Sequence, residues 1–173
     1  LYINPPSDLK SASVTLTVME EVPFQINGAN YITLKGLDVN GSRNSAYSIS
    51  KGEHNTIVDC DISYTAKKAA VIAGTHNGIR DSYIHDVDGG VGLSGGDIAT
   101  LTEAENFAEN NHIERFTRLT KTYMPAVSID GVGNRAMHNE MNDAAHQAIS
   151  FGGQCNKIMY NNIYNVLQET DDA

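Results

Sequence analysis

The sequence predicts an all-β protein folded as a right-handed parallel β-helix, a single-stranded solenoid with coils of about 22–29 residues. Three observations predict this fold: an asparagine that recurs along the chain, apolar residues at fixed distances from it, and a composition rich in glycine and asparagine. Aromatic residues make up only 7 % of the 173 residues, and tryptophan is absent. This composition favours short strands joined by tight corners over a helical bundle, so we expect few helices.

Six asparagines mark the repeat, at intervals of 22 to 29 residues. They are Asn30, Asn55, Asn77, Asn106, Asn134 and Asn156. An apolar residue follows each of them after two positions and another after seven, as Ile57 and Ile62 do after Asn55. This spacing predicts two short strands per coil, whose inward side chains are covered by the neighbouring coils. We interpret the asparagines as structural corner residues and not as ligands.

A third strand is predicted ahead of each of the last five asparagines, where an apolar pair precedes a glycine. The glycines are Gly52, Gly74, Gly95, Gly131 and Gly152, and the last apolar pair is Ile149 and Phe151. Glycine suits these corners because it tolerates positive φ. The last three coils also carry Asn111, Asn139 and Asn161 five positions after the repeated asparagine. Stacked asparagines of this kind can form a hydrogen-bonded ladder along the axis.

Length and composition predict one domain over residues 1–173. The apolar start, 1–6, and the run 13–22 are expected to form strands of earlier or flanking coils. Neither end shows the polar cap that a solenoid needs for solubility. We therefore expect the chain to be part of a longer β-helix, with further coils of the same parent chain as its partners.

The charge pattern excludes some classes of function. The formal net charge is −9, and the 12 lysines and arginines form no run, which argues against a nucleic-acid binder. No stretch of apolar residues is long enough to predict a membrane span. An acidic sugar remains compatible with this charge, because a bound calcium ion or a local basic group can reverse the field.

Two longer intervals contain inserts at 97–104 and 116–124, which we expect at the same corner of successive coils, as walls of a binding face. Because successive coils lie about 4.8 Å apart, polar residues at matching corners should form a line across the surface. The candidates for substrate binding are His146, Lys121, Tyr123, Glu169 and Asp97.

A pair of carboxyl groups on this surface would indicate a glycoside hydrolase. The two carboxyl groups lie about 5–5.5 Å apart in enzymes that retain the anomeric configuration and about 6.5–9.5 Å apart in enzymes that invert it. Asp130 follows the predicted strand 127–129, and Asp171 and Asp172 come two coils later. Two coil spacings amount to roughly 9–10 Å, which allows an inverting pair. Ordinary turn aspartates are the alternative interpretation of all three residues.

Two other functions fit the same residues. A polysaccharide lyase needs a base near a uronate whose carboxylate is neutralised by a cation. Lys121 with Asp86, Asp88 and Asp97 could supply that site, with calcium as its cofactor, whereas the hydrolase requires no cofactor. The third alternative is a non-catalytic module that binds carbohydrate or supports other domains.

A resemblance to a known family rests on an ordered set of motifs. They include Gly95-Gly96-Asp97, Asn110-Asn111-His112-Ile113, Tyr123-Met124-Pro125-Ala126, Gly131-Val132-Gly133-Asn134, Ala145-His146-Gln147-Ala148-Ile149, Tyr160-Asn161-Asn162-Ile163 and Glu169-Thr170-Asp171-Asp172-Ala173. This succession resembles the right-handed β-helix proteins of the pectate-lyase-like superfamily, in particular the secreted bacterial proteins that include glycoside hydrolase family 141.

The resemblance implies a secreted or periplasmic bacterial enzyme that degrades plant or host polysaccharide and is fucosidase- or xylanase-like. It also implies paired catalytic aspartates, which it assigns to Asp130 and Asp171, with Asp172 as the rival of Asp171. A carbohydrate-active β-helix protein, most simply a glycoside hydrolase, is therefore the leading hypothesis from the sequence.

Overall fold

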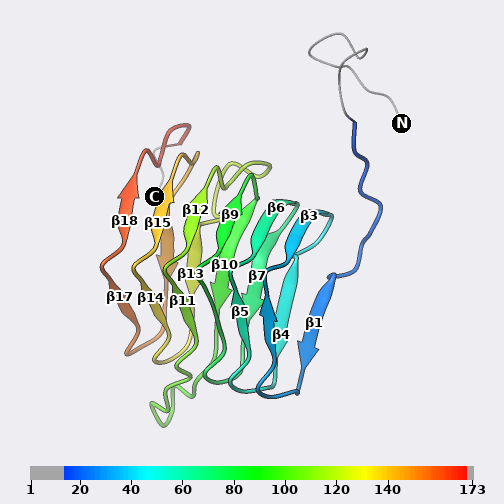
Figure 1. Cartoon of the computed structure of the whole chain (residues 1–173). Coiled ribbons are helices and arrows are strands. Elements are labelled where there is room, and N and C mark those ends of the chain that lie inside the picture. Colours follow the sequence, from blue (N-terminus) through cyan, green and yellow to red (C-terminus); the bar gives the residue numbers. More distant parts are fainter. Residues whose placement is uncertain (1–13, 171–173) are drawn as a thin grey trace.

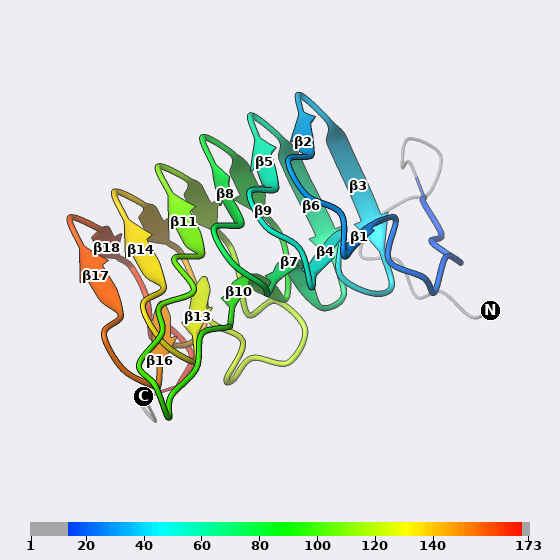
Figure 2. The same cartoon turned by 90° about the horizontal axis from the view of Figure 1, so that it is seen from below.

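The computed structural model describes residues 14–170, and within this range the chain forms strands and no helix. The strands build three parallel sheets of six strands each (Figure 1). Each coil contributes one strand to every sheet, so strands adjacent in a sheet come from successive coils (Figure 2). The predicted fold, a right-handed parallel β-helix, is thereby confirmed.

The strands are short, and their bounds follow the repeat. Sheet A contains β1 (Phe24–Asn27), β4 (Tyr47–Ser50), β7 (Lys68–Ile72), β10 (Gly89–Leu93), β13 (Val127–Ile129) and β16 (Ile149–Phe151). Sheet B contains β2 (Thr33–Lys35), β5 (Thr56–Val58), β8 (Gly78–Arg80), β11 (Phe107–Glu109), β14 (Arg135–Met137) and β17 (Lys157–Met159). Sheet C contains β3 (Asp38–Ser42), β6 (Asp61–Thr65), β9 (Tyr83–His85), β12 (His112–Glu114), β15 (Glu140–Asn142) and β18 (Asn162–Tyr164).

The core consists of rows of apolar side chains that the register aligns from coil to coil. Ile57 pairs with Ile79 in sheet B, and Ile62 pairs with Ile84 in sheet C. All four are completely buried. A row of this kind removes apolar surface from water only because each coil covers its neighbours, which explains why the apolar pattern repeats with the coil.

The last coil departs from the prediction at Phe151. The sequence pattern places this residue in the core as the partner of Ile149, and it does align with the buried Ile129. Its side chain is nevertheless 70 % exposed, because β16 is the terminal strand of sheet A in the described part of the chain.

Asparagine ladders hold two of the corners, the predicted one at Asn111, Asn139 and Asn161 and a second one at the recurring asparagines. At the corner between sheets A and B, Asn77 Oδ1 accepts hydrogen bonds from the backbone N–H and the side-chain amide of Asn55. At the corner between sheets B and C, Asn139 Oδ1 accepts the same pair of bonds from Asn111. These side chains are buried, which confirms their structural role.

The two inserts lie at different corners, so the prediction of a shared corner is wrong. Residues 97–104 connect β10 of sheet A to β11 of sheet B, whereas 116–124 connect β12 of sheet C to β13 of sheet A. Figure 1 shows them at opposite ends of the strands. The interval between two repeated asparagines gives only the number of residues in a coil. An insert lengthens this interval by the same amount at any corner, so the interval does not show at which corner the insert lies. The inserts therefore border sheet A from both ends.

The prediction of a flanking strand in 13–22 is not met within the described residues. Residues 14–22 form no strand and lie at the β1 end of the stack (Figure 1). The exposed apolar side chains of Val14, Leu16 and Val18 belong to this segment. The predicted strand at 1–6 lies outside the described residues. In the described part of the chain, no helix is long and apolar enough to cross a membrane.

Candidate functional site

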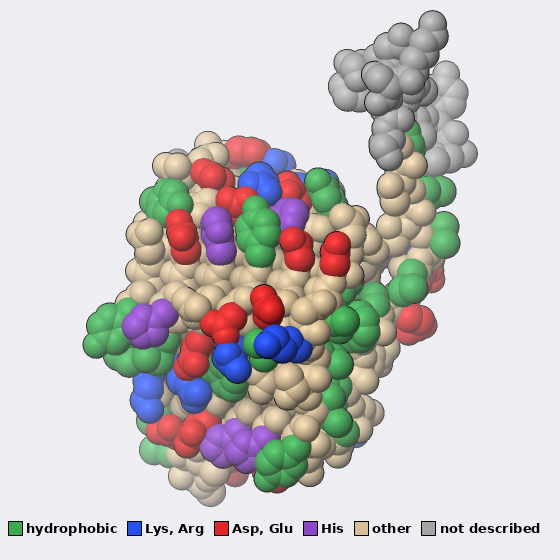
Figure 3. All heavy atoms as spheres, viewed as in Figure 1, with side chains coloured by type: hydrophobic (Ala, Val, Ile, Leu, Met, Phe, Trp, Pro, Cys, Tyr) green, Lys and Arg blue, Asp and Glu red, His purple; other side chains and the backbone are tan. Residues whose placement is uncertain are grey.

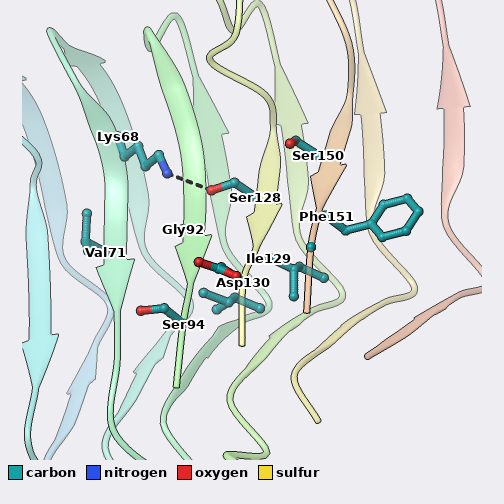
Figure 4. A pocket seen from close by; sticks show the side chains of 11 residues that line it. Lys68, Val71, Gly92, Ser94, Ser128, Ile129, Asp130, Ser150 and Phe151 are labelled. Atoms are coloured by element: carbon teal, nitrogen blue, oxygen red, sulfur yellow. Dashed lines mark hydrogen bonds between the residues drawn. The ribbon is translucent and has the colours of Figure 1, made fainter. Parts of the chain in front are cut away.

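A shallow groove lies on the outer face of sheet A. The outward row of this sheet consists of small side chains, because the register aligns Ser48, Val71, Gly92, Ser128 and Ser150. Small residues leave the backbone accessible and create a hollow of about 440 Å³. Lys68, Ser94, Asp130 and Phe151 complete its lining, together with adjacent backbone (Figure 4).

Lys68 reaches across this groove from the start of β7. Its Nζ atom donates a hydrogen bond to Ser128 Oγ on β13, at 2.6 Å, and so spans the intervening strand β10 (Figure 4). Burial lowers the pKa of the Lys68 ammonium, because the charged form loses hydration. Lys68 is not among the candidates that the sequence pattern indicates, because its register partner in the next coil is Gly89 and the position carries no repeated polar residue.

Asp130 lines the groove two residues after Ser128, directly after β13 (Figure 4). Its carboxylate is exposed, and Oδ1 accepts a hydrogen bond from the backbone N–H of Gly131 at 2.8 Å. Asn134 Nδ2 donates to the Asp130 carbonyl oxygen at 3.0 Å and holds the backbone of this corner. Asp130 is therefore a carboxylate on a fixed backbone that a molecule in the groove can contact.

Four of the predicted substrate-binding residues do come together, at the other end of the strands. Lys121 and Glu169 form an exposed ion pair at 2.7 Å. The ring of Tyr123 lies 4.9 Å from that of the buried His146, whose Nδ1 accepts the backbone N–H of Tyr123 at 3.4 Å. The insert 116–124 thus rests on the corner before β16.

This cluster is separated from Asp130 by the length of a strand. Lys121 and Tyr123 precede β13, whereas Asp130 follows it. The segment from Met124 to Asp130 advances about 3.3 Å per residue, which puts the two ends about 15–20 Å apart. The structure therefore brings Asp130 to the groove without the other four candidates. Asp171 and Asp172 lie outside the described residues, so their role as the second carboxylate stays a prediction.

Asp97 lies in the insert at the corner after β10, far from Lys121. Its backbone exchanges two hydrogen bonds with Thr102, and its Oδ1 accepts the N–H of Ala99 at 2.8 Å. These bonds close the turn of the insert, which gives Asp97 a structural role in this loop. The structure does not combine Asp97 and Lys121 into one site.

The other two acids of the lyase hypothesis stabilise the chain. Asp88 is buried, and its Oδ1 accepts the backbone N–H groups of Leu119 and Thr120 at 2.8 and 2.9 Å, which anchors the insert 116–124. Asp86 forms a two-pronged pair with Arg115, and these hydrogen bonds lower the pKa of the Asp86 carboxyl group. Within residues 14–170, no three His, Cys, Asp or Glu side chains gather to hold a metal ion.

The outer face of sheet C carries acidic, histidine and tyrosine side chains. Figure 3 shows acidic, histidine and other side chains in a row across it. His85 contacts Asp61 and Asp86 at 3.1 and 2.9 Å, and the ring of Tyr83 stacks on His85 at 4.3 Å. Because these groups satisfy one another across successive coils, we interpret the row as a stabilising surface network and not as the functional site.

The fold and the groove define the class of protein: a right-handed parallel β-helix with a shallow groove on one sheet. The family model of the right handed beta helix region matches residues 24–168, and the chain belongs to this family. No curated protein and no solved structure matches the chain. The narrower resemblance to glycoside hydrolase family 141 stays a prediction.

Proposed function

We propose that the groove on sheet A binds a carbohydrate chain and that the protein is a glycoside hydrolase in which Asp130 supplies one of the two carboxyl groups. The observation that carries this proposal is the exposed Asp130 carboxylate in a groove lined by the hydroxyl groups of Ser94, Ser128 and Ser150. Hydroxyl and carboxylate groups both accept hydrogen bonds, and hydroxyls also donate them, which matches the hydroxyl groups of sugars.

The shape of the groove supports an extended ligand. It crosses β7, β10, β13 and β16. Strands in a sheet are about 4.8 Å apart, so the groove extends for about 14 Å along the stack. The inserts 97–104 and 116–124 border the ends of these strands and can contact a chain that lies across them.

The second carboxyl group is assigned to Asp171 or Asp172, as the sequence predicts. The same proposal includes secretion or a periplasmic location in a bacterium, because polysaccharide is an extracellular substrate. Lys121 is the base of the lyase alternative, but its ion pair with Glu169 and its distance from the groove support that alternative less well.

Asp130→Asn is expected to lower the kcat for glycoside hydrolysis by about 100-fold or more, since a positioned acid or base contributes about 10²–10⁴-fold. The substitution preserves size and removes the ionisable group. The measurement is the release of reducing ends from xylan and from fucose-containing polysaccharides.

Asp59→Asn is the matched control, because Asp59 is an exposed aspartate with a φ of 54° at the corner between sheets B and C. It should leave kcat unchanged. Undiminished hydrolysis by Asp130→Asn would overturn the assignment. Products that absorb in the ultraviolet would indicate a lyase, and binding without turnover would indicate a non-catalytic module; both results contradict the hydrolase.

A further inference from the structure

The contact between Lys68 and Ser128 is unusual because it spans three strands. Lys68 is on β7 and Ser128 is on β13, with β10 between them. Glycines on β10 make this reach feasible. A Cβ atom at Gly92 would lie 2.8 Å from Lys68 Nζ, and one at Gly89 would lie 3.0 Å from Lys68 Cγ. The two glycines therefore form a channel that holds the lysine side chain against the sheet.

The lysine is also partly removed from water. Met124, from the insert 116–124, places its Cε atom 3.1 Å from the point that a Cβ at Gly89 would occupy, beside the lysine stem. Asp130 is the other charged side chain that lines the groove. Partial burial lowers the pKa of Lys68, because the charged ammonium loses hydration, so the neutral amine forms more easily than in an exposed lysine.

We propose that Ser128 and Lys68 form a nucleophile–base pair that removes O-acyl groups from the carbohydrate held in the groove. The inference rests on the proposed function for its substrate class, O-acylated sugars. A serine hydroxyl within hydrogen-bond distance of a partly desolvated lysine is the arrangement that activates a serine. Gly89 and Gly92 act as positioning residues, because they hold the lysine in place.

The reaction needs only the ester and water. Neutral Lys68 accepts the proton of the Ser128 hydroxyl while Oγ bonds to the ester carbonyl carbon. The tetrahedral adduct then collapses, the bond between this carbon and the sugar oxygen breaks, and the sugar oxygen takes the proton from Lys68. Water attacks the acyl-serine, Lys68 accepts a proton from it, and the carboxylic acid leaves as this proton returns to Ser128.

Ser150 can stabilise the negative charge that develops on the carbonyl oxygen. It is in register with Ser128 on the neighbouring strand and lines the same groove. Adjacent strands are about 4.8 Å apart, which brings its hydroxyl close enough to donate a hydrogen bond to an oxyanion on Ser128.

A fluorophosphonate probe tests the nucleophile directly, and mass spectrometry locates the adduct. We expect labelling at Ser128, with loss of fluoride, and a rate at least about 100-fold lower in Lys68→Met. Gly92→Ala should also lower the rate at least 10-fold while it keeps both reacting groups. Ser48→Ala is the matched control, since Ser48 occupies the same row of sheet A outside the groove, and its rate should equal that of the parent.

The pH profile of labelling shows whether Lys68 acts as a general base or only holds Ser128 in place. The labelling rate should rise as Lys68 loses its proton, with a midpoint below the ordinary lysine value of about 10.4, and Lys68→Met should abolish this rise. No adduct at Ser128, or an equal rate in the parent and Lys68→Met, overturns the proposal.

Acetate release from acetylated xylo-oligosaccharides, followed by NMR, tests the substrate class. We expect release by the parent and at least 100-fold less by Ser128→Ala. Ser48→Ala should retain this activity, because Ser48 occupies the same row of sheet A outside the groove. Binding of the deacetylated oligosaccharides, by calorimetry, reports the carbohydrate groove itself. Labelling at Ser128 without any oligosaccharide binding would refute the proposed function, while Ser128 would still be a nucleophile. Binding of the oligosaccharide without acetate release would refute the esterase activity.

Discussion

Asn77→Ala is expected to lower the free energy of unfolding by about 3–5 kcal/mol, because several buried groups lose their hydrogen bonds at once. Asn77 Oδ1 accepts from the backbone N–H of Asn55, and Nδ2 donates to the carbonyl groups of Gly52 and Ala73. Each buried polar group left without a partner costs about 1–3 kcal/mol. Alanine replaces none of these bonds and leaves a gap between two coils.

Urea unfolding followed by circular dichroism measures this effect. Asn27→Ala is the control, since Asn27 is exposed at the end of β1 and its side chain makes one long contact, with Ser50 Oγ at 3.5 Å. That change should shift stability by less than about 0.5 kcal/mol. Equal midpoints for the two variants would show that the ladder does not stabilise the stack.

Gly131→Ala is expected to destabilise the protein by at least about 3 kcal/mol, through a steric clash and an unfavourable backbone conformation. A Cβ atom at this position would lie 2.0 Å from the carbonyl oxygen of Gly95 in the preceding coil. The φ angle of Gly131 is 93°, which L side chains rarely adopt. Because the clashing atom belongs to the backbone, relief requires the two coils to move apart.

Gly152→Ala is the matched control for this change. Gly152 lies at the same corner one coil later, but the nearest atom to its added Cβ would be Asp130 Oδ1 at 3.7 Å, an ordinary contact. Thermal unfolding should show a large decrease in Tm for Gly131→Ala and a small change for Gly152→Ala. Similar decreases for both would contradict the stacked-corner explanation.

These two residues illustrate how much of the fold was predictable. The asparagines and the apolar positions repeat with the coil, so the sequence predicts two or three strands per coil and the ladder of Asn111, Asn139 and Asn161. The predicted corner glycine of the last coil was Gly152, whereas the structure stacks Gly153 on Gly131. Both positions are glycine in the sequence, and only the register distinguishes the residue that faces the carbonyl group.

The candidate site was predicted only in part. Asp130 was selected from its place after a strand, and the structure puts it at the groove. Lys121, Tyr123, His146 and Glu169 were expected to share a line with it, but they lie before the strands of sheet A and Asp130 lies after them. The position of a residue in the repeat predicts reliably which coil it belongs to. It predicts less reliably whether the residue lies before or after a strand.

The sequence by itself determined the coil, because apolar residues recur at the inward strand positions and asparagines recur at the corners with the period of one coil. Only the tertiary structure decided where the inserts lie and which outward side chains meet. Lys68 and Ser128 are 60 residues apart, with both inserts between them, and carry no repeating signal. Their contact depends on the register of three strands and on two glycines between them, which exist only once the coils have stacked.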